Sequence, residues 1–261
     1  MRDLHVAVTG ASAGIGAAVA REFAAAGARL TLVARRRPLL DALAAELAAE
    51  FATTSHVVAA DLGDLAAATA WIPGAERALG PIDVLVNNAG VQIVAPTVAT
   101  DLAAAEALLA VDLLAPLRLC LAVLPGMLAR GRGALVNVAS MAAVAPTPGM
   151  FYYSAAKAGL GGASEALHGE LRGTGVHVLT VYPGPVRTDM ETAARARYEP
   201  SFVADHLPTG DCVALARRIR RALARRQARL LYPRFYYLAR WFPGVTSWVL
   251  GRHTPALRPP S

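Results

Sequence analysis

Three observations predict a doubly wound α/β fold for most of this 261-residue chain. Between residues 4 and 179, short apolar runs alternate with alanine-rich stretches of helical length, which is the pattern of repeated βαβ units. The apolar runs are almost uniformly hydrophobic, as strands are when helices cover both faces of a parallel sheet. No low-complexity linker or change of composition divides this region. We therefore predict a single domain with a central parallel sheet flanked by helices.

The elements can be placed in order along the chain. Strands are expected over 4–9, 29–34, 56–60, 82–86, 134–139 and 176–182, with helices over 15–26, 38–50 and 64–79. A helix over 211–227 is predicted because Leu215, Ile219 and Leu223 recur every four residues, with arginines mostly elsewhere around the helix. A short strand over 228–232 follows. We assign 1–232 to the main domain and 233–261 to an aromatic and basic extension of it.

Composition narrows the classes of function. The formal net charge is +7, but no aromatic stacking motif or helix-turn-helix pattern accompanies the arginines, so nucleic-acid binding is not expected. No run approaches the roughly 20 uninterrupted apolar residues of a membrane-spanning helix, and the first residues do not resemble a secretory signal. The cysteines lie far apart and the histidines are scattered, so we expect no metal site. These features predict a cytoplasmic protein.

A glycine-rich segment, TGASAGIG over 9–16, joins the first predicted strand to the first predicted helix. Glycines at such a turn let the backbone approach a pyrophosphate, and the helix N-terminus offers unpaired N–H donors. The alternative is an ordinary tight turn. The position of the segment at the first strand favours dinucleotide binding and a Rossmann-type domain. The residues expected around the phosphates are Gly10, Ser12, Gly14, Ile15 and Gly16.

The end of the second predicted strand indicates which dinucleotide binds. An acidic side chain at this place accepts hydrogen bonds from the adenosine ribose, whereas this chain has Arg35 and Arg36. Because guanidinium groups match phosphate groups, we predict NADP(H), held first by Arg35 and second by Arg36. The alternative is a solvated basic corner at a helix start, which the helix dipole disfavours. Asp61 is placed either to reach the adenine amino group or to cap the next helix.

One lysine, Lys157, occurs among the 26 basic residues, and it follows Tyr153 by four residues. On a helix this spacing brings the ammonium within one turn of the phenol. A phenol with a pKa near ~10 is a poor proton shuttle at neutral pH, and a neighbouring positive charge favours its phenolate. The pair alone is weak evidence, since the same spacing occurs on ordinary solvated helices.

Together these motifs resemble the short-chain dehydrogenase/reductase family over roughly residues 4–190, in the family's order. Ser140 precedes Tyr153 by 13 residues, which is the spacing usual in that family. The resemblance implies that Asn87 supports the adenosine side and the central sheet, and that Val186 and Thr188 contact the nicotinamide carboxamide and phosphate region. The further cofactor contacts that it implies are Leu62, Ala89, Gly90, Pro183 and Gly184.

The resemblance implies an NADPH-dependent oxidoreductase that reversibly reduces a ketone or an aldehyde to an alcohol. The nicotinamide carries the hydride, and the protein orients it and moves a proton. Tyr153 would be the acid/base, Lys157 would lower the pKa of Tyr153 and hold the nicotinamide ribose, and Ser140 would donate a hydrogen bond to the substrate oxygen. Without its spacing from Tyr153, Ser140 would be interpreted as a strand-end cap.

Two other classes of function stay open. One is a catalytically silent NADP(H)-binding sensor or interaction protein, and the other is an epimerase or dehydratase, since a fold does not determine a reaction. Asp112 bears on the first, because the family commonly has an asparagine there, whose main-chain carbonyl holds a relay water. A main-chain role survives the change to aspartate, whereas the new carboxylate would alter the coupled titration of Tyr153 and Lys157. We predict a working relay with a shifted pH optimum.

The substrate-binding loop of the family corresponds to residues 189–208, where Met190, Tyr198, Phe202 and Leu207 suggest an apolar alcohol or ketone. Three roles are open for the aromatic extension over 233–261: core packing, subunit contact, or an amphipathic surface resting on a membrane. We expect a homodimer or homotetramer, cytoplasmic, with peripheral membrane contact as one of these three roles.

Overall fold

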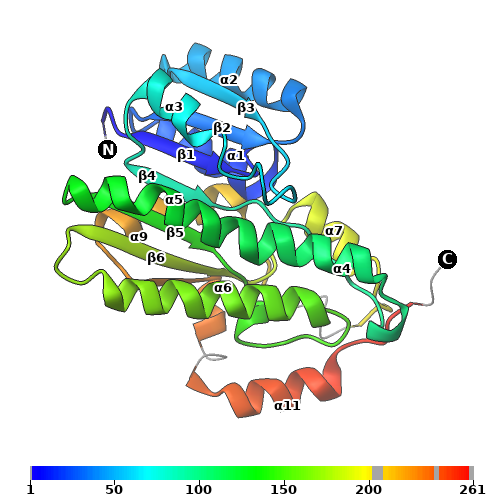
Figure 1. The fold of residues 1–261 in the computed structure, drawn as a ribbon. Helices are drawn as coiled ribbons and strands as arrows, with labels where there is room; N and C mark the ends of the chain where they lie inside the picture. The colour runs from blue at the N-terminus through cyan, green and yellow to red at the C-terminus, as the bar shows by residue number, and fades with distance from the viewer. Residues whose placement is uncertain (1, 202–207, 238–240, 259–261) are drawn as a thin grey trace.

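Seven parallel strands form the centre of the molecule, in the order β3-β2-β1-β4-β5-β6-β7 (Figure 1). This computed structural model describes residues 2–201, 208–237 and 241–258. The strands are β1 His5–Thr9, β2 Arg29–Ala34, β3 Ser55–Ala59, β4 Val84–Asn87, β5 Gly133–Val138, β6 Val176–Pro183 and β7 Arg229–Tyr232. Each lies within two residues of its predicted limits. The predicted doubly wound α/β fold is confirmed.

Helices cover both faces of the sheet, because alternate residues of each strand point to opposite sides. Val6 and Val8 of β1 pack with α1 (Gly14–Ala24), α2 (Arg37–Phe51) and α9 (Cys212–Ala224) on one face. Ala7, between them, faces α3 (Ile72–Leu79) and α5 (Ala115–Ala129) on the other. Leu215, Ile219 and Leu223 are buried on α9, as the spacing predicts.

The remaining described helices lie around the sheet and the loops that follow its strands. They are α4 (Leu102–Leu109), α6 (Phe151–Glu170), α7 (Asp189–Arg195) and α11 (Pro243–His253), with short 3-10 turns η1 (Thr97–Ala99), η3 (Met141–Ala143) and η4 (Arg234–Tyr236). Figure 1 shows α4, α5 and α6 running across the same face, with α11 apart from the sheet at the bottom of the view. The assignment of 1–232 and 233–261 to one domain with an extension stays a prediction.

The predicted helix over 64–79 is wrong in its first half. Residues 64–71 form successive turns, and the helix begins only at Ile72. Two features explain the difference. Oδ1 of Asp64 accepts hydrogen bonds from the N–H groups of Ala66 and Ala67, which favours a local turn. Pro73 lacks an N–H donor and fits only the first turn of a helix, so it starts α3 instead of lying within a longer one.

Helices α4 and α5 are continuous through a π-helical segment, η2 (Ala110–Leu114). The resulting helix, Leu102–Ala129, is long and apolar enough to cross a membrane by length and composition, although the chain has no uninterrupted apolar run of that length. Its inner face belongs to the core, since Leu108, Leu119 and Met127 are buried against the rest of the domain. The π segment also buries Asp112. One face of this helix therefore packs in the core, whereas Leu114, Leu121 and Leu128 are exposed.

Candidate active site

A cavity of about 880 Å³ opens at the carboxyl ends of the strands. It lies where the strand order changes direction, since β1 pairs with β2 on one side and β4 on the other. The cavity is lined by all but two of the residues predicted to bind cofactor or act in catalysis. The exceptions are Gly16 and Asn87.

The glycine loop forms one wall of the cavity. Gly10 and Gly14 have positive φ angles of 65° and 55°. A Cβ on Gly10 would lie 2.8 Å from Cα of Ala89, so the loop can approach the β4 end only without a side chain. A Cβ on Gly16 would lie 2.2 Å from the carbonyl oxygen of Gly10. Gly16 therefore permits packing of α1 against the loop and does not line the cavity itself.

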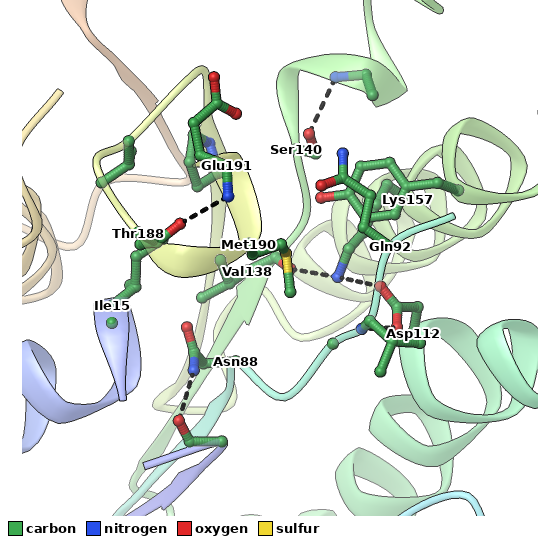
Figure 2. Close-up of a pocket in the computed structure, with 18 of the residues that line it drawn as sticks. Ile15, Asn88, Gln92, Asp112, Val138, Ser140, Lys157, Thr188, Met190 and Glu191 are labelled. Carbon is green, nitrogen blue, oxygen red and sulfur yellow. Dashed lines mark hydrogen bonds and ion pairs between the residues drawn. The ribbon is translucent and has the colours of Figure 1, made fainter. Parts of the chain in front are cut away.

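The two asparagines at the end of β4 have different places. Asn87 is buried behind the cavity, where its Nδ2 donates to Oδ1 of Asn137 at 2.8 Å. It matches the sheet-supporting role and not a contact lining the cavity. Asn88, which sequence analysis did not single out within its motif, lines the cavity, and its Nδ2 donates to the carbonyl of Thr9 at 3.0 Å (Figure 2). Asn88 thus joins β4 to the start of the glycine loop.

The arginines predicted to bind the adenosine phosphate lie at the cavity. Arg35 and Arg36 both line it, and Nη2 of Arg36 donates to Oγ of Ser12 at 3.1 Å. Leu62 and Asp61 lie beside them. Oδ1 of Asp61 accepts a hydrogen bond from the N–H of Gly63 at 2.9 Å and so stabilises the loop after β3. Since α3 begins only at Ile72, Asp61 caps a turn and not a helix.

Lys157 and Asp112 form a buried ion pair at the other end. The ammonium of Lys157 lies 3.1 Å from Oδ2 of Asp112 and donates to the carbonyl oxygen of Val138 at 3.2 Å (Figure 2). The side chain of Lys157 is 5% exposed and that of Asp112 is fully buried. Oδ1 of Asp112 accepts from the N–H of Val91 at 2.7 Å. An ammonium has three N–H donors, so one of them is left for a group in the cavity.

Tyr153 lies beside this pair on the same helix as Lys157. The Lys157 ammonium is 5.8 Å from the centre of the Tyr153 ring. Burial raises the pKa of Tyr153 above its ordinary value; Lys157 acts in the opposite direction, and Asp112 adds to the rise. Burial lowers the pKa of Lys157, but Asp112 and Tyr153 outweigh burial and raise it. The expected lowering by Lys157 is therefore present, but burial and the Asp112 carboxylate outweigh it in the protein without cofactor.

Ser140 caps a short turn and also lies at the cavity. It follows β5 and caps η3, where its Oγ accepts from the N–H of Ala142 at 3.1 Å (Figure 2). The Ser140 side chain also acts to lower the pKa of Tyr153, against the larger effect of burial. Its hydroxyl faces the cavity beside Tyr153. A substrate oxygen between these two hydroxyls would meet two hydrogen-bond donors.

The match to known proteins agrees with this geometry. The family model described as short chain dehydrogenase matches residues 4–199. The chain belongs to the short-chain dehydrogenase family. A family member from Sphingobium yanoikuyae, solved in complex with NADPH, is 33% identical, covers 95% of both chains and has a TM-score of 0.80. A metagenomic short-chain oxidoreductase in complex with NADP is 34% identical, with a TM-score of 0.74 over 88% of this chain and 97% of its own.

Curated members of the short-chain dehydrogenase family match a shorter region. A fatty acyl-CoA reductase of Mycobacterium tuberculosis is 37% identical over 196 residues, which is 74% of this chain and 66% of that protein. Two further curated relatives are matched over 60% and 62% of their own length. The match to these three relatives therefore leaves a third or more of each outside it.

Apolar side chains line part of the cavity, and among the named residues of the 189–208 loop that the structure describes, Met190 contributes to this lining. The walls of the cavity include Met141, Ala142, Ala145, Met150 and Met190. Of the other predicted loop residues, Tyr198 lies outside the cavity and donates to the carbonyl of Pro148 at 2.8 Å. Phe202 and Leu207 lie outside the described residues.

The last lining residues follow β6. Pro183, Gly184, Val186 and Thr188 all lie at the cavity, as the family resemblance implied. Thr188 also caps α7, since its Oγ1 accepts from the N–H of Glu191 at 3.1 Å (Figure 2). The side chain of Thr188 thus holds the first turn of α7 at the rim of the cavity.

Several polar and aromatic lining residues were not predicted. Besides Asn88, they include Gln92, Glu191, Phe235 and Tyr236. Burial raises the pKa of Glu191, which pairs with Arg195 at 3.3 Å. Gln92 and Glu191 belong to no recognisable sequence motif. The aromatic residues of η4 are distant in sequence from most of the other residues that line the cavity. Among the described residues there is no cluster of three His, Cys, Asp or Glu side chains able to hold a metal ion.

Proposed function

We propose that this protein is an NADPH-dependent oxidoreductase that reversibly reduces a ketone or aldehyde to an alcohol. The observation that carries the proposal is the joint position of Ser140, Tyr153 and Lys157 in one cavity with the glycine loop. The cavity residues fit NADP(H), because the loop needs the positive φ of Gly10 and Gly14 and the adenosine end presents Arg35 and Arg36. The NADP(H)-bound relatives support the same cofactor.

Each side chain has a task in this reaction. NADPH, when bound, supplies the hydride that forms the new C–H bond. Tyr153 donates its phenolic proton to the carbonyl oxygen, and Ser140 donates a hydrogen bond to the same oxygen as negative charge develops on it. Lys157 stabilises the phenolate left on Tyr153 and directs its free N–H toward the ribose hydroxyls. In alcohol oxidation Tyr153 accepts the proton instead.

An apolar substrate is part of the proposal. Methionine and alanine side chains surround the space next to Ser140 and Tyr153, and Phe235 and Tyr236 close it from the C-terminal side. Such a pocket binds hydrocarbon better than a polyol, since it offers few partners for hydroxyl groups. The acidic side chain of Glu191 also lines the cavity.

The test is a substrate screen with matched tyrosine variants. Ketones, aldehydes and the corresponding alcohols are assayed with NADPH and NADH, following cofactor oxidation or reduction by absorbance. Tyr153→Phe should lower kcat/KM by about a hundredfold to ten-thousandfold, the usual contribution of a general acid or base. Tyr152→Phe removes the adjacent hydroxyl and should change little. Undiminished turnover in Tyr153→Phe would assign the proton transfer to another group.

The second candidate is an NADP(H)-binding sensor or interaction protein without turnover. The ion pair favours it, because Asp112 offsets the charge by which Lys157 would activate Tyr153. Titration of NADPH against the parent protein separates the two candidates. Tight binding with no turnover of any screened carbonyl, and no change on Tyr153→Phe, would favour the sensor.

We propose further that the protein acts as a homodimer or homotetramer. Leu114, Leu121 and Leu128 are exposed and recur every seven residues along the helix that continues from η2 through α5. Such a stripe suits contact with a second copy of the chain. A cytoplasmic location with peripheral membrane contact through the C-terminal segment belongs to the same proposal, and the exposed aromatic side chains of that segment support it.

A further inference from the structure

A second hollow lies on the other side of η4 from the candidate active site. It is a groove of about 580 Å³ between α9, β7 and η4. Its basic lining residues are Arg217, Arg218, Arg221, Arg225 and Arg234. Among the residues that the structure describes, no aspartate or glutamate lines it. We call it the arginine groove.

The charges of the arginine groove are only weakly balanced. Arg217 lies 3.9 Å from Glu22, and the guanidinium of Arg218 lies 5.4 Å from the centre of the Tyr232 ring. Within the part of the chain that the structure describes, Arg221, Arg225 and Arg234 have no carboxylate partner. By contrast, Arg220, which does not line the groove, makes a close ion pair with Glu22 of α1 at 2.6 Å. The unpaired guanidinium groups are therefore gathered on the side of α9 that faces the groove.

Helix electrostatics explain only some of these positions. Cations near a helix C-terminus are favoured by the helix dipole, which accounts for Arg221 and Arg225. Arg217 and Arg218 lie earlier on α9, and Arg234 belongs to η4. Like charges four residues apart on a helix repel one another, so Arg217, Arg221 and Arg225 disfavour α9 unless an anion binds between them. Guanidinium groups bind phosphate oxygens with paired N–H donors, which makes phosphate the anion best suited to the groove.

The 3-10 turn η4 places this groove next to exposed aromatic side chains. Arg234 and Tyr237 line the arginine groove, whereas Phe235 and Tyr236 between them line the active-site cavity. Phe235 and Tyr237 are also exposed, and Phe242 follows them along the chain with its ring mostly in solvent. Trp241 is 76% exposed and Trp248 is 65% exposed. Figure 1 shows α11, which carries Trp248, on the outside of the molecule.

We propose that the arginine groove and these aromatic side chains form one docking surface for a membrane that contains anionic phospholipids. Arginines bind the lipid phosphates while aromatic side chains enter the interfacial layer, a combination typical of proteins that rest on bilayers. Anionic phospholipids are thus the lipid class, and these residues the protein side, of the membrane contact proposed above. It does not depend on the reductase activity. Because Phe235 lines the cavity and is exposed, docking would place the substrate entrance close to the lipid.

Vesicle sedimentation of the full chain tests the proposal. The protein is mixed with vesicles of phosphatidylcholine alone, or of phosphatidylcholine and phosphatidylglycerol in equal amounts. We expect sedimentation with the anionic vesicles only, weakening as salt is added. Arg221→Gln/Arg225→Gln should bind about thirtyfold more weakly, since each arginine near an anionic surface contributes about fivefold. Arg77→Gln/Arg172→Gln removes the same charge from exposed positions outside the groove and should bind like the parent.

Tryptophan fluorescence gives an independent readout of the aromatic side chains. Trp71 is 7% exposed in the core, so a blue shift on adding anionic vesicles reports Trp241 and Trp248. Trp241→Ala should reduce both the shift and the sedimented fraction. Inorganic tripolyphosphate forms a second arm of the test. Binding of tripolyphosphate without any vesicle binding would assign the groove to a soluble phosphate ligand and overturn the proposal.

Three other results would also overturn it. They are no sedimentation with either vesicle, equal sedimentation with both, and equal loss in the groove and control variants, the last of which would indicate net charge alone. The NADPH assay in solution is run on the same variants. A protein that sediments as expected but reduces no carbonyl would refute the proposed function and leave the docking surface intact.

Discussion

At the scale of single residues, the carboxylate of Asp112 is a buried charge close to Tyr153, the proposed proton-transfer group. Lys157 balances Asp112 at 3.1 Å, so the ammonium is shared between stabilising a phenolate and neutralising a permanent anion. Asp112 accordingly contributes to raising the pKa of Tyr153. An asparagine would keep the main-chain carbonyl and the shape of the side chain without the charge.

Asp112→Asn should move the pH–rate profile to lower pH. With the carboxylate removed, the phenolate of Tyr153 is less opposed and its pKa falls. Alcohol oxidation requires the phenolate, so its rising limb shifts to lower pH. Carbonyl reduction requires the protonated phenol, so its falling limb shifts in the same direction. Steady-state kcat/KM measured against pH in both directions tests this, with Glu50→Gln as a control on the exposed end of α2. Superimposable curves for parent and Asp112→Asn would remove Asp112 from the mechanism.

Lys157→Met should destabilise the fold as well as reduce activity. Removing the ammonium leaves the fully buried Asp112 unpaired, which typically costs about 3–5 kcal/mol. Burial already raises the pKa of Asp112, and without Lys157 nothing nearby offsets burial except the Val91 N–H. A carboxyl whose folded-state pKa is raised stabilises the fold at low pH and loses that contribution as pH rises.

The stability of Lys157→Met should therefore approach that of the parent as the pH is lowered. Thermal unfolding across a pH series measures the gap in Tm. The double variant Lys157→Met/Asp112→Asn removes the buried charge and should recover most of the lost Tm at neutral pH. A gap in Tm that is independent of pH, together with no recovery in the double variant, would show that the loss comes from packing and not from charge.

At the scale of elements, the end of β2 carries the arginines that we propose select the cofactor. Arg35 and Arg36 line the cavity, and Arg36 is held toward the glycine loop by its hydrogen bond to Ser12. Arg37 begins α2 and pairs with Asp41 at 3.4 Å outside the cavity. Adjacent arginines in one basic run thus have different surroundings.

Arg35→Asp should raise KM for NADPH by about tenfold to a hundredfold. This range corresponds to the loss of about 1.5–3 kcal/mol for a hydrogen bond to a charged group. KM for NADH should stay the same or fall, because an acidic side chain accepts hydrogen bonds from the ribose hydroxyls. Arg37→Asp makes the same charge change outside the cavity and should have little effect. A parent enzyme that prefers NADH would contradict the assignment of Arg35.

Helices, strands and turns could be predicted where the residues within the segment determine its structure. Strands buried on both faces are mostly apolar, and the glycine-rich segment indicates a turn, so both could be placed from the sequence. The start of α3 is set by the turn that the Asp64 side chain stabilises and by Pro73, which fits only the first turn of a helix. The composition of this stretch favours a helix throughout, so it does not indicate where the helix begins. Gln92 and Glu191 reach the cavity only through tertiary packing. No periodicity in the sequence indicates that residues of η4 line the same cavity as the glycine loop that follows β1.

At the scale of the whole molecule, Leu102–Ala129 has one face in the core and another in solvent. Leu108, Leu119 and Met127 are buried, whereas Leu114, Leu121 and Leu128 are exposed, with Leu121 71% exposed. The apolar residues of this helix therefore lie on two faces, one packed in the core and one exposed on the surface. Burying the exposed leucines against a second copy would remove apolar area from water, at about 25 cal/mol per Å².

Leu121→Glu should shift the assembly toward smaller species. A glutamate in the middle of the leucine stripe removes apolar contact and places like charges opposite each other across a twofold interface. Loss of one leucine per subunit is worth about 1.5–3 kcal/mol, so the dissociation constant should rise by at least about tenfold. Val98→Glu changes a side chain that is 99% exposed outside the stripe and serves as the control. Sedimentation velocity over a range of protein concentrations measures the species. A parent protein that stays monomeric at every concentration would show that the leucine stripe makes no subunit contact, and an oligomer unaffected by Leu121→Glu would place the contact on another face.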